Sequence, residues 1–143
     1  MVRAIKRLNP LQVISLIGLV VVDILWLLNV KGMKDLFYVV LGLNILGHLL
    51  FTMKWTREGK TNFSKLDKKY SKNLTRKPSE TIFFSCVALY LLVCLMVVMG
   101  TIFKFQPSDY IPALTICAFI VNISSLIVVE RTYREVVALI KKK

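Results

Sequence analysis

Four long apolar stretches alternate with charged segments along the chain. They cover about residues 11–30, 36–53, 81–103 and 110–129. Between them they contain one carboxylate, Asp23, and one imidazole, His48. A helix of about 20 apolar residues crosses the roughly 30 Å hydrocarbon core of a bilayer, where each backbone amide must be hydrogen-bonded within its own helix. The pattern therefore predicts an all-α, polytopic membrane protein with four transmembrane helices.

The polar segments between the apolar stretches predict two helical hairpins. Short outer turns, at about 31–35 and 104–109, join the first span to the second and the third to the fourth. A long basic segment at 54–80 connects the two hairpins, and a basic tail follows the fourth span at 130–143. Since the spans use more than half of the 143 residues, we predict a single four-helix transmembrane domain over residues 1–143.

The distribution of charge predicts the orientation. The chain has a net charge of +12, and 17 of its 20 Lys and Arg lie in the N-terminal arm, the 54–80 segment or the tail. Basic residues stay on the cytoplasmic side of a membrane, so we expect a protein of the cell membrane with both termini in the cytoplasm. A basic excess can also indicate nucleic-acid binding, but the membrane explanation suffices and we expect no nucleic-acid partner.

We expect the basic connecting segment to contact an anionic inner leaflet. Apolar residues recur at helical spacing over 63–74, which favours a short amphipathic helix on the membrane surface. A disordered basic linker is the alternative. The lysines that lie mostly off the apolar stripe are the predicted lipid-headgroup contacts: Lys65, Lys68, Lys69 and Lys72.

Asp23 is the first candidate functional residue. An acid in the middle of a span costs about 2.5–3.5 kcal/mol on insertion scales. Counted from the outer ends of the first and second spans, Asp23 and Asn44 are seven and nine residues deep, which puts them within about 3 Å of the same depth. A hydrogen bond between them across the first hairpin is therefore expected. The site is either proton- or cation-responsive, or it is structural.

A second group of polar residues is predicted deeper in the membrane. By depth, His48, Tyr90 and Asn122 fall in one layer. Gly42 and Gly47 are small enough to let another helix approach the second span. Two interpretations remain open. These residues form a packing seam held by hydrogen bonds of about 0.6 kcal/mol each, or they line a polar path through the bundle.

The sequence lacks the patterns typical of catalytic and metal sites. It has no paired carboxylates, no Ser–His–Asp or His–Cys set, no glycine-rich phosphate loop and no metal-ligand spacing. Its cysteines, Cys86, Cys94 and Cys117, all fall within spans and form no CxxC pair. We therefore predict no enzymatic activity, no cofactor and no metal.

Parts of the chain resemble known membrane families. The acid in the first of four spans, Asp23, is similar to the arrangement in small multidrug transporters. The stretch 48–56, HLLFTMKWT, and the basic central segment resemble GtrA-like flippase subunits, although His48 stands where that family usually has asparagine. These resemblances imply a small transporter or a lipid-linked sugar flippase component. Small bacteriocin immunity proteins and holins are also basic, multi-span chains of similar size.

Together these patterns favour a small non-enzymatic membrane protein that works through helix–helix or lipid contacts, as an accessory or immunity-type subunit. Its expected partner is another membrane protein or a second copy of this chain. The alternatives are a small transporter or flippase component that uses Asp23, and a holin-like pore former.

Overall fold

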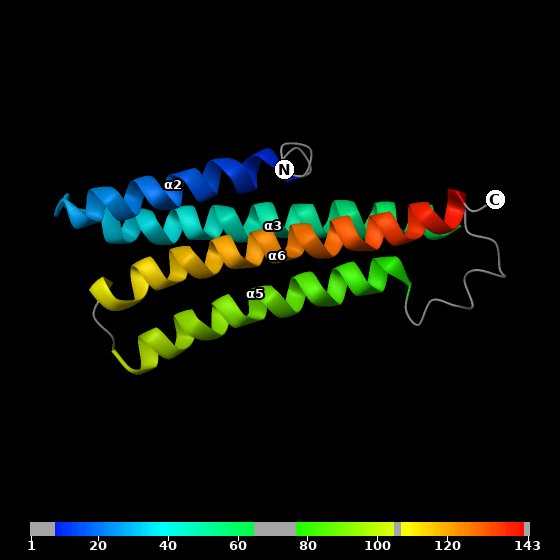
Figure 1. Ribbon diagram of the computed structural model, residues 1–143. Helices are drawn as coiled ribbons and strands as arrows, with labels where there is room; N and C mark the ends of the chain where they lie inside the picture. The colour runs from blue at the N-terminus through cyan, green and yellow to red at the C-terminus, as the bar shows by residue number, and fades with distance from the viewer. Residues whose placement is uncertain (1–7, 65–76, 105–106, 142–143) are drawn as a thin grey trace.

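The computed structural model describes residues 8–64, 77–104 and 107–141, and over these residues it contains helices and no strand. The helices, shown in Figure 1, are α2 (Pro10–Leu27), α3 (Met33–Ser64), α5 (Pro78–Ile102) and α6 (Pro107–Lys141). All four are long and apolar enough to cross a membrane. The predicted all-α fold with four membrane-spanning helices is thus confirmed.

The helices form two antiparallel hairpins. The start of α2, the end of α3, the start of α5 and the end of α6 all point toward the same end of the bundle (Figure 1), which we call the basic end. At the opposite end the first hairpin turns through residues 28–32, where Asn29 and Gly32 have φ angles of 58° and 81°. Glycine accepts a positive φ because it has no Cβ, as this short turn requires.

Proline begins three of the four helices, at Pro10, Pro78 and Pro107. Its missing N–H would be unpaired in a first turn anyway, and its φ angle is already helical. α2 has in addition a capping box, in which the side chain of Asn9 accepts a backbone N–H and its own N–H donates to Gln12 Oε1 at 3.0 Å. Because proline suits a first helical turn, α6 starts at Pro107, inside the segment that the sequence predicts as a turn.

Two helices extend well beyond the predicted spans. α3 has 32 residues and α6 has 35, so they are about 48 and 52 Å long, against roughly 30 Å of hydrocarbon. Residues 54–64, predicted to begin the connecting segment, are helical because Lys, Arg and Glu are good helix formers. The extension of α6 carries two ion pairs at i,i+4 spacing, Arg134–Glu130 at 2.8 Å and Arg131–Glu135 at 3.2 Å.

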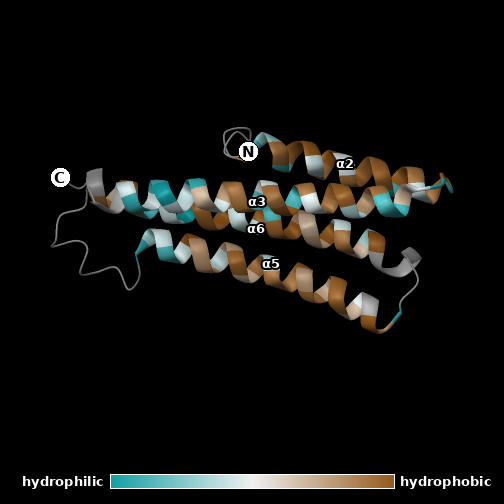
Figure 2. Ribbon diagram, turned by 180° about the vertical axis from the view of Figure 1, so that it is seen from behind, coloured by the Kyte–Doolittle hydropathy of each residue, from teal (hydrophilic) through white to brown (hydrophobic). Residues whose placement is uncertain are grey.

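α3 is the central helix and packs against α2, α5 and α6. Large side chains such as Leu19, Phe37 and Ile111 fill the interior and are fully buried. Figure 2 shows hydrophobic residues along most of each helix, whereas hydrophilic residues gather on α3 toward the basic end. Many of the large apolar side chains are exposed on the outside of the bundle. An apolar outer surface is the arrangement that a lipid environment requires.

Candidate functional site

Six buried polar side chains meet inside the bundle and form what we call the polar core. They are Gln12 and Ser15 of α2, Asn44 and His48 of α3, Tyr90 of α5, and Asn122 of α6. Tyr90 is 8% exposed and the other five are at most 3% exposed. Since every helix contributes, the polar core connects the two hairpins to each other.

Asn44 lies at the centre of the polar core. Its Nδ2 donates to Ser15 Oγ at 2.9 Å. Its Oδ1 accepts from Tyr90 OH at 2.8 Å and from Asn122 Nδ2 at 3.1 Å. One side chain therefore binds three other helices. A buried polar group without a partner costs roughly 2–7 kcal/mol in an apolar environment, so these bonds fix the helices in one register.

Gln12 and Asn122 connect the first helix to the last. Gln12 Nε2 donates to Asn122 Oδ1 at 2.6 Å, and Asn122 Nδ2 also donates to the carbonyl oxygen of Ala118 at 2.7 Å. Gln12 Oε1 accepts the backbone N–H of Asn9 in the helix cap. Both nitrogen and oxygen of each side-chain amide thus have partners within the protein.

The hydrogen-bond pattern assigns one neutral tautomer to His48. Its Nε2 lies 3.3 Å from the carbonyl oxygen of Cys86, which can only accept, so Nε2 carries the proton. Nδ1 then accepts from Gln12 Nε2 at 3.5 Å. The ring also packs on Tyr90, with ring centroids 4.4 Å apart. A proton on Nδ1 would face the Gln12 amide donor, so this arrangement favours a packed histidine over a proton carrier.

The predicted layer of His48, Tyr90 and Asn122 does come together, and Asn44 joins it. Sequence reasoning misses the two α2 members, Gln12 and Ser15, because both lie close to the predicted start of the first span. A polar residue there normally faces headgroups and water. The available signal was their i,i+3 spacing, which places them on one helix face.

Asp23 lies outside the polar core, and the expected hydrogen bond to Asn44 is absent, since Asn44 bonds Ser15 instead. The turn lies three residues earlier than the sequence predicts, because α2 ends at Leu27 and α3 begins at Met33. Asp23 is then four residues from the turn and Asn44 is eleven. The difference of seven residues separates them by roughly 10 Å along the bundle.

Asp23 of α2 is partly buried, beside α6. Its Oδ1 is buried and has no hydrogen-bond partner. The hydroxyl of Thr115 on α6 is beside it, but their geometry is not that of a hydrogen bond, and Thr115 Oγ1 is also unpartnered. Unlike the polar core, this part of the bundle therefore has polar atoms free to take a partner.

Gly47 permits the close approach of α2 to α3 beside the polar core. A Cβ at position 47 would lie 3.0 Å from both the backbone nitrogen and Cγ of Gln12. Gly42, the second predicted approach position, is exposed, and a Cβ there would meet nothing within 4 Å. The prediction of close helix approach is confirmed at Gly47 and wrong at Gly42.

The predicted headgroup lysines lie outside the described residues, and their role stays a prediction: Lys65, Lys68, Lys69 and Lys72. In the part of the chain that the structure describes, no three His, Cys, Asp or Glu side chains are grouped to hold a metal ion. The cysteines there are free thiols, with Cys86 buried beside His48 and Cys94 exposed.

These features define the class of protein: a four-helix bundle with a membrane-compatible outer surface and an internally paired polar core. Comparison with protein-family models, curated proteins and solved structures finds no match to this chain. Any functional inference therefore rests on its own residues and their geometry.

Proposed function

We propose that this protein is a non-enzymatic integral membrane protein that acts through helix–helix and lipid contacts, as an accessory or immunity-type subunit. The observation that carries the proposal is the internal pairing of the polar core. The amides of Gln12, Asn44 and Asn122 and the ring of His48 hydrogen-bond to one another and to nearby backbone. Transport or proton relay needs polar groups that exchange partners, whereas paired groups favour a structural role.

The outer helix faces are where such a subunit contacts its partner. Several large apolar side chains on these faces are about 60% exposed: Ile17 on α2, Leu91 on α5 and Ile127 on α6. Lipid solvates these side chains as well as another helix does, so association in the membrane depends on shape and close packing. The proposed partner is a second membrane protein or a second copy of this chain.

The proposed location is the cell membrane, with both termini in the cytoplasm and an anionic inner leaflet at the basic end. The support is the charge bias of 17 among 20 Lys and Arg toward the termini and the connecting segment. The connecting segment contains two glycosylation sequons, at Asn62 and Asn73. Glycosylation of either one during translation into microsomes would contradict this orientation.

Co-purification tests the subunit proposal. A tagged full-length chain is extracted from native membranes in mild detergent, and the complex is weighed by native mass spectrometry. We expect a membrane protein at fixed stoichiometry. Ile17→Trp on α2 and Leu91→Trp on α5 serve as a matched pair, because both positions are exposed on different helices. A partner that binds one of these faces is displaced by the replacement on that face and retained by the other. A chain that purifies alone as a monomer would overturn the proposal.

The second candidate function is a small transporter or flippase component, and the observation that favours it is Asp23. A carboxylate oxygen that is buried within a span and has no hydrogen-bond partner is costly, so it is usually kept for a purpose. Thr115, also unpartnered, would supply a second oxygen to a proton or cation held there. This function predicts that the protein purifies as a homo-oligomer that is active after reconstitution.

The substitution Asp23→Asn separates the two functions. The amide preserves shape and removes the charge, so a coupling residue loses pH-dependent transport in proteoliposomes while thermal stability in detergent is retained. In a structural role, the same variant changes expression or stability instead. Thr115→Val is a second test of the same site, because it removes the neighbouring hydroxyl and leaves the carboxylate in place. If Asp23→Asn alters neither transport nor stability, Asp23 has no part in either function.

A further inference from the structure

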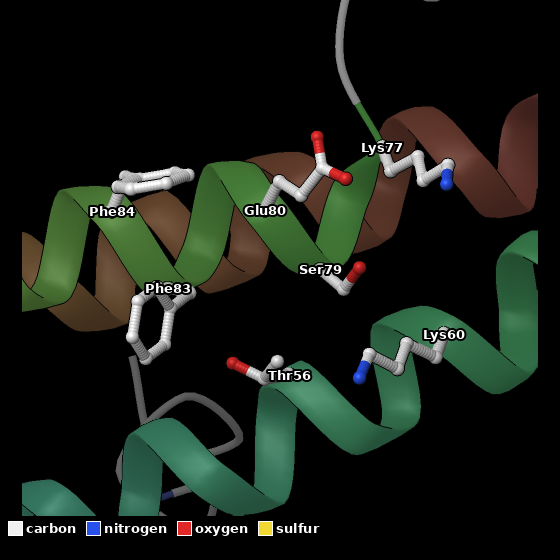
Figure 3. Close-up of a pocket in the computed structure, with 7 residues that line it drawn as sticks. All are labelled: Thr56, Lys60, Lys77, Ser79, Glu80, Phe83 and Phe84. Carbon is white, nitrogen blue, oxygen red and sulfur yellow. The ribbon is translucent and has the colours of Figure 1, made fainter.

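A cleft opens between α3 and α5 at the basic end of the bundle (Figure 3). Its volume is about 700 Å³, within the range of small-molecule sites. α3 contributes Thr56 and Lys60 to the wall, and the start of α5 contributes Lys77 and Ser79. The cleft is separate from the polar core, since Thr56 lies eight residues, roughly 12 Å, beyond His48 along α3.

Two lysines border this cleft, Lys60 on α3 and Lys77 immediately before α5. Lys60 and Lys77 are both exposed, and neither forms an ion pair with another described residue. Figure 3 shows the Lys60 ammonium in the gap between α3 and α5, whereas the Lys77 side chain leaves the chain just before α5 and extends to the side of the gap. Glu80 also borders the cleft, but its side chain points to the side of α5 away from α3 (Figure 3). The cleft therefore has a net positive charge where it opens.

Neutral donors complete the polar part of the cleft. Ser79 is 3% exposed and lies in the first turn of α5, with its hydroxyl on the side that faces α3 (Figure 3). Across the gap, Thr56 Oγ1 is buried and has no hydrogen-bond partner. The helix dipole of α5 also favours an anion at this end. Phosphate oxygens are the acceptors that two ammonium groups, two hydroxyls and a helix start together suit.

The cleft continues into an apolar part formed by Phe83 and Phe84. Their rings are 45% and 58% exposed and meet edge to face, with centroids 5.6 Å apart. Phe83 is one helical turn, roughly 6 Å, deeper in the span than Ser79. Charged, hydroxyl and aromatic groups thus follow one another along α5 in the order in which a phospholipid presents its phosphate, glycerol and acyl chains. A soluble phosphate would use the charged part alone.

We propose that this cleft binds one anionic phospholipid of the adjacent leaflet. The phosphate binds the Lys60 ammonium in the gap, Lys77 at the rim adds a second positive charge, and the acyl chains lie against Phe83 and Phe84. The site deepens the lipid-contact part of the proposed function and rests on the proposed orientation. Its test is separate from that of the subunit proposal, because binding is measured on the isolated chain without any partner.

The test uses the purified full-length chain in a neutral detergent. Fluorescent phosphatidylglycerol is the probe, and phosphatidylcholine with the same acyl chains is the headgroup control. We expect the double variant Lys60→Gln, Lys77→Gln to weaken binding of the anionic probe at least about tenfold, since two charge-assisted contacts are lost. The matched control is Lys54→Gln, Arg57→Gln, which removes the same charge from exposed positions on α3 that do not border the cleft. This control is expected to bind within about twofold of the original chain.

Three results would overturn the proposal. Equal weakening in both double variants would mean that only the overall charge of the basic end attracts the lipid. Equal binding of both headgroups would mean that phosphate charge is not recognised. Complete displacement of the probe by millimolar inorganic phosphate would make the ligand a soluble phosphate compound and not a lipid. Phe83→Ala distinguishes further, because it weakens lipid binding only if the acyl chain occupies the apolar part.

Discussion

Replacing Asn44 with leucine is expected to lower the free energy of unfolding by about 2–5 kcal/mol. The substitution removes three hydrogen bonds at once, to Ser15, Tyr90 and Asn122. It leaves the Tyr90 hydroxyl without the acceptor that Asn44 supplies, whereas Ser15 Oγ still donates to the carbonyl oxygen of Gln12 and Asn122 Nδ2 to that of Ala118. Measured hydrogen bonds in membrane bundles are worth about 0.6–1.7 kcal/mol each, which sets this range. Titration with a denaturing detergent, monitored by the fluorescence of Trp26 and Trp55, measures the change.

The matched control is Leu43→Ala, because Leu43 is the preceding residue on α3 and is 43% exposed. It should change the unfolding free energy by less than about 0.5 kcal/mol. A double-mutant cycle with Tyr90→Phe should show coupling, since either single variant removes the hydrogen bond from the Tyr90 hydroxyl to Asn44. An Asn44→Leu variant as stable as the original chain would refute the stabilising role of the polar core.

Gly47→Ala is expected to destabilise the bundle by about 1–3 kcal/mol, although alanine is the better helix former. The new Cβ would lie 3.0 Å from backbone as well as side-chain atoms of Gln12. Backbone cannot rotate away, so α2 must shift as a whole. That shift also lengthens the bonds from Gln12 to Asn122 and His48. The same detergent titration reports the loss.

Gly42→Ala is the control on the same helix, five residues away. Its Cβ meets nothing within 4 Å, so only the helix preference remains and the variant should be neutral or more stable by at most about 1 kcal/mol. Glycine-to-alanine substitution is thus expected to lower the stability at position 47 and to leave it unchanged or raise it at position 42. Equal effects at the two positions would show that the close contact of α2 with α3 does not limit stability.

The fold could be predicted from the sequence because the bilayer leaves so few choices. Four apolar stretches of this length have one viable secondary structure in lipid, and their number and order then give two hairpins. The helix ends could not be predicted equally well. Hydropathy marks where the hydrocarbon ends, whereas α3 continues through Ser64 because charged residues remain good helix formers.

The same uncertainty in the helix ends explains which part of the candidate site was predicted. The layer of His48, Tyr90 and Asn122 depends on positions near the middle of the spans, where an error of three residues changes little. The supposed Asp23–Asn44 pair depends on counting from the outer turn, and a shift of three residues there separates the two by two helical turns. Depth alone also gives no rotation about the helix axis, which is why the role of Gln12 was visible only in the assembled bundle.

The hydrogen bond between Gln12 and Asn122 joins residues 110 positions apart, and this separation has a consequence for synthesis. At about 5–20 residues per second, a ribosome needs roughly 5 to 20 seconds to make the intervening chain. The first hairpin enters the membrane during that interval with Gln12 and Asn44 still lacking their partners on the last helix. In the nascent hairpin Gln12 therefore has only Asn9 and His48 as partners, and Asn44 Oδ1 lacks both of its donors, so the polar core is completed only when α6 arrives.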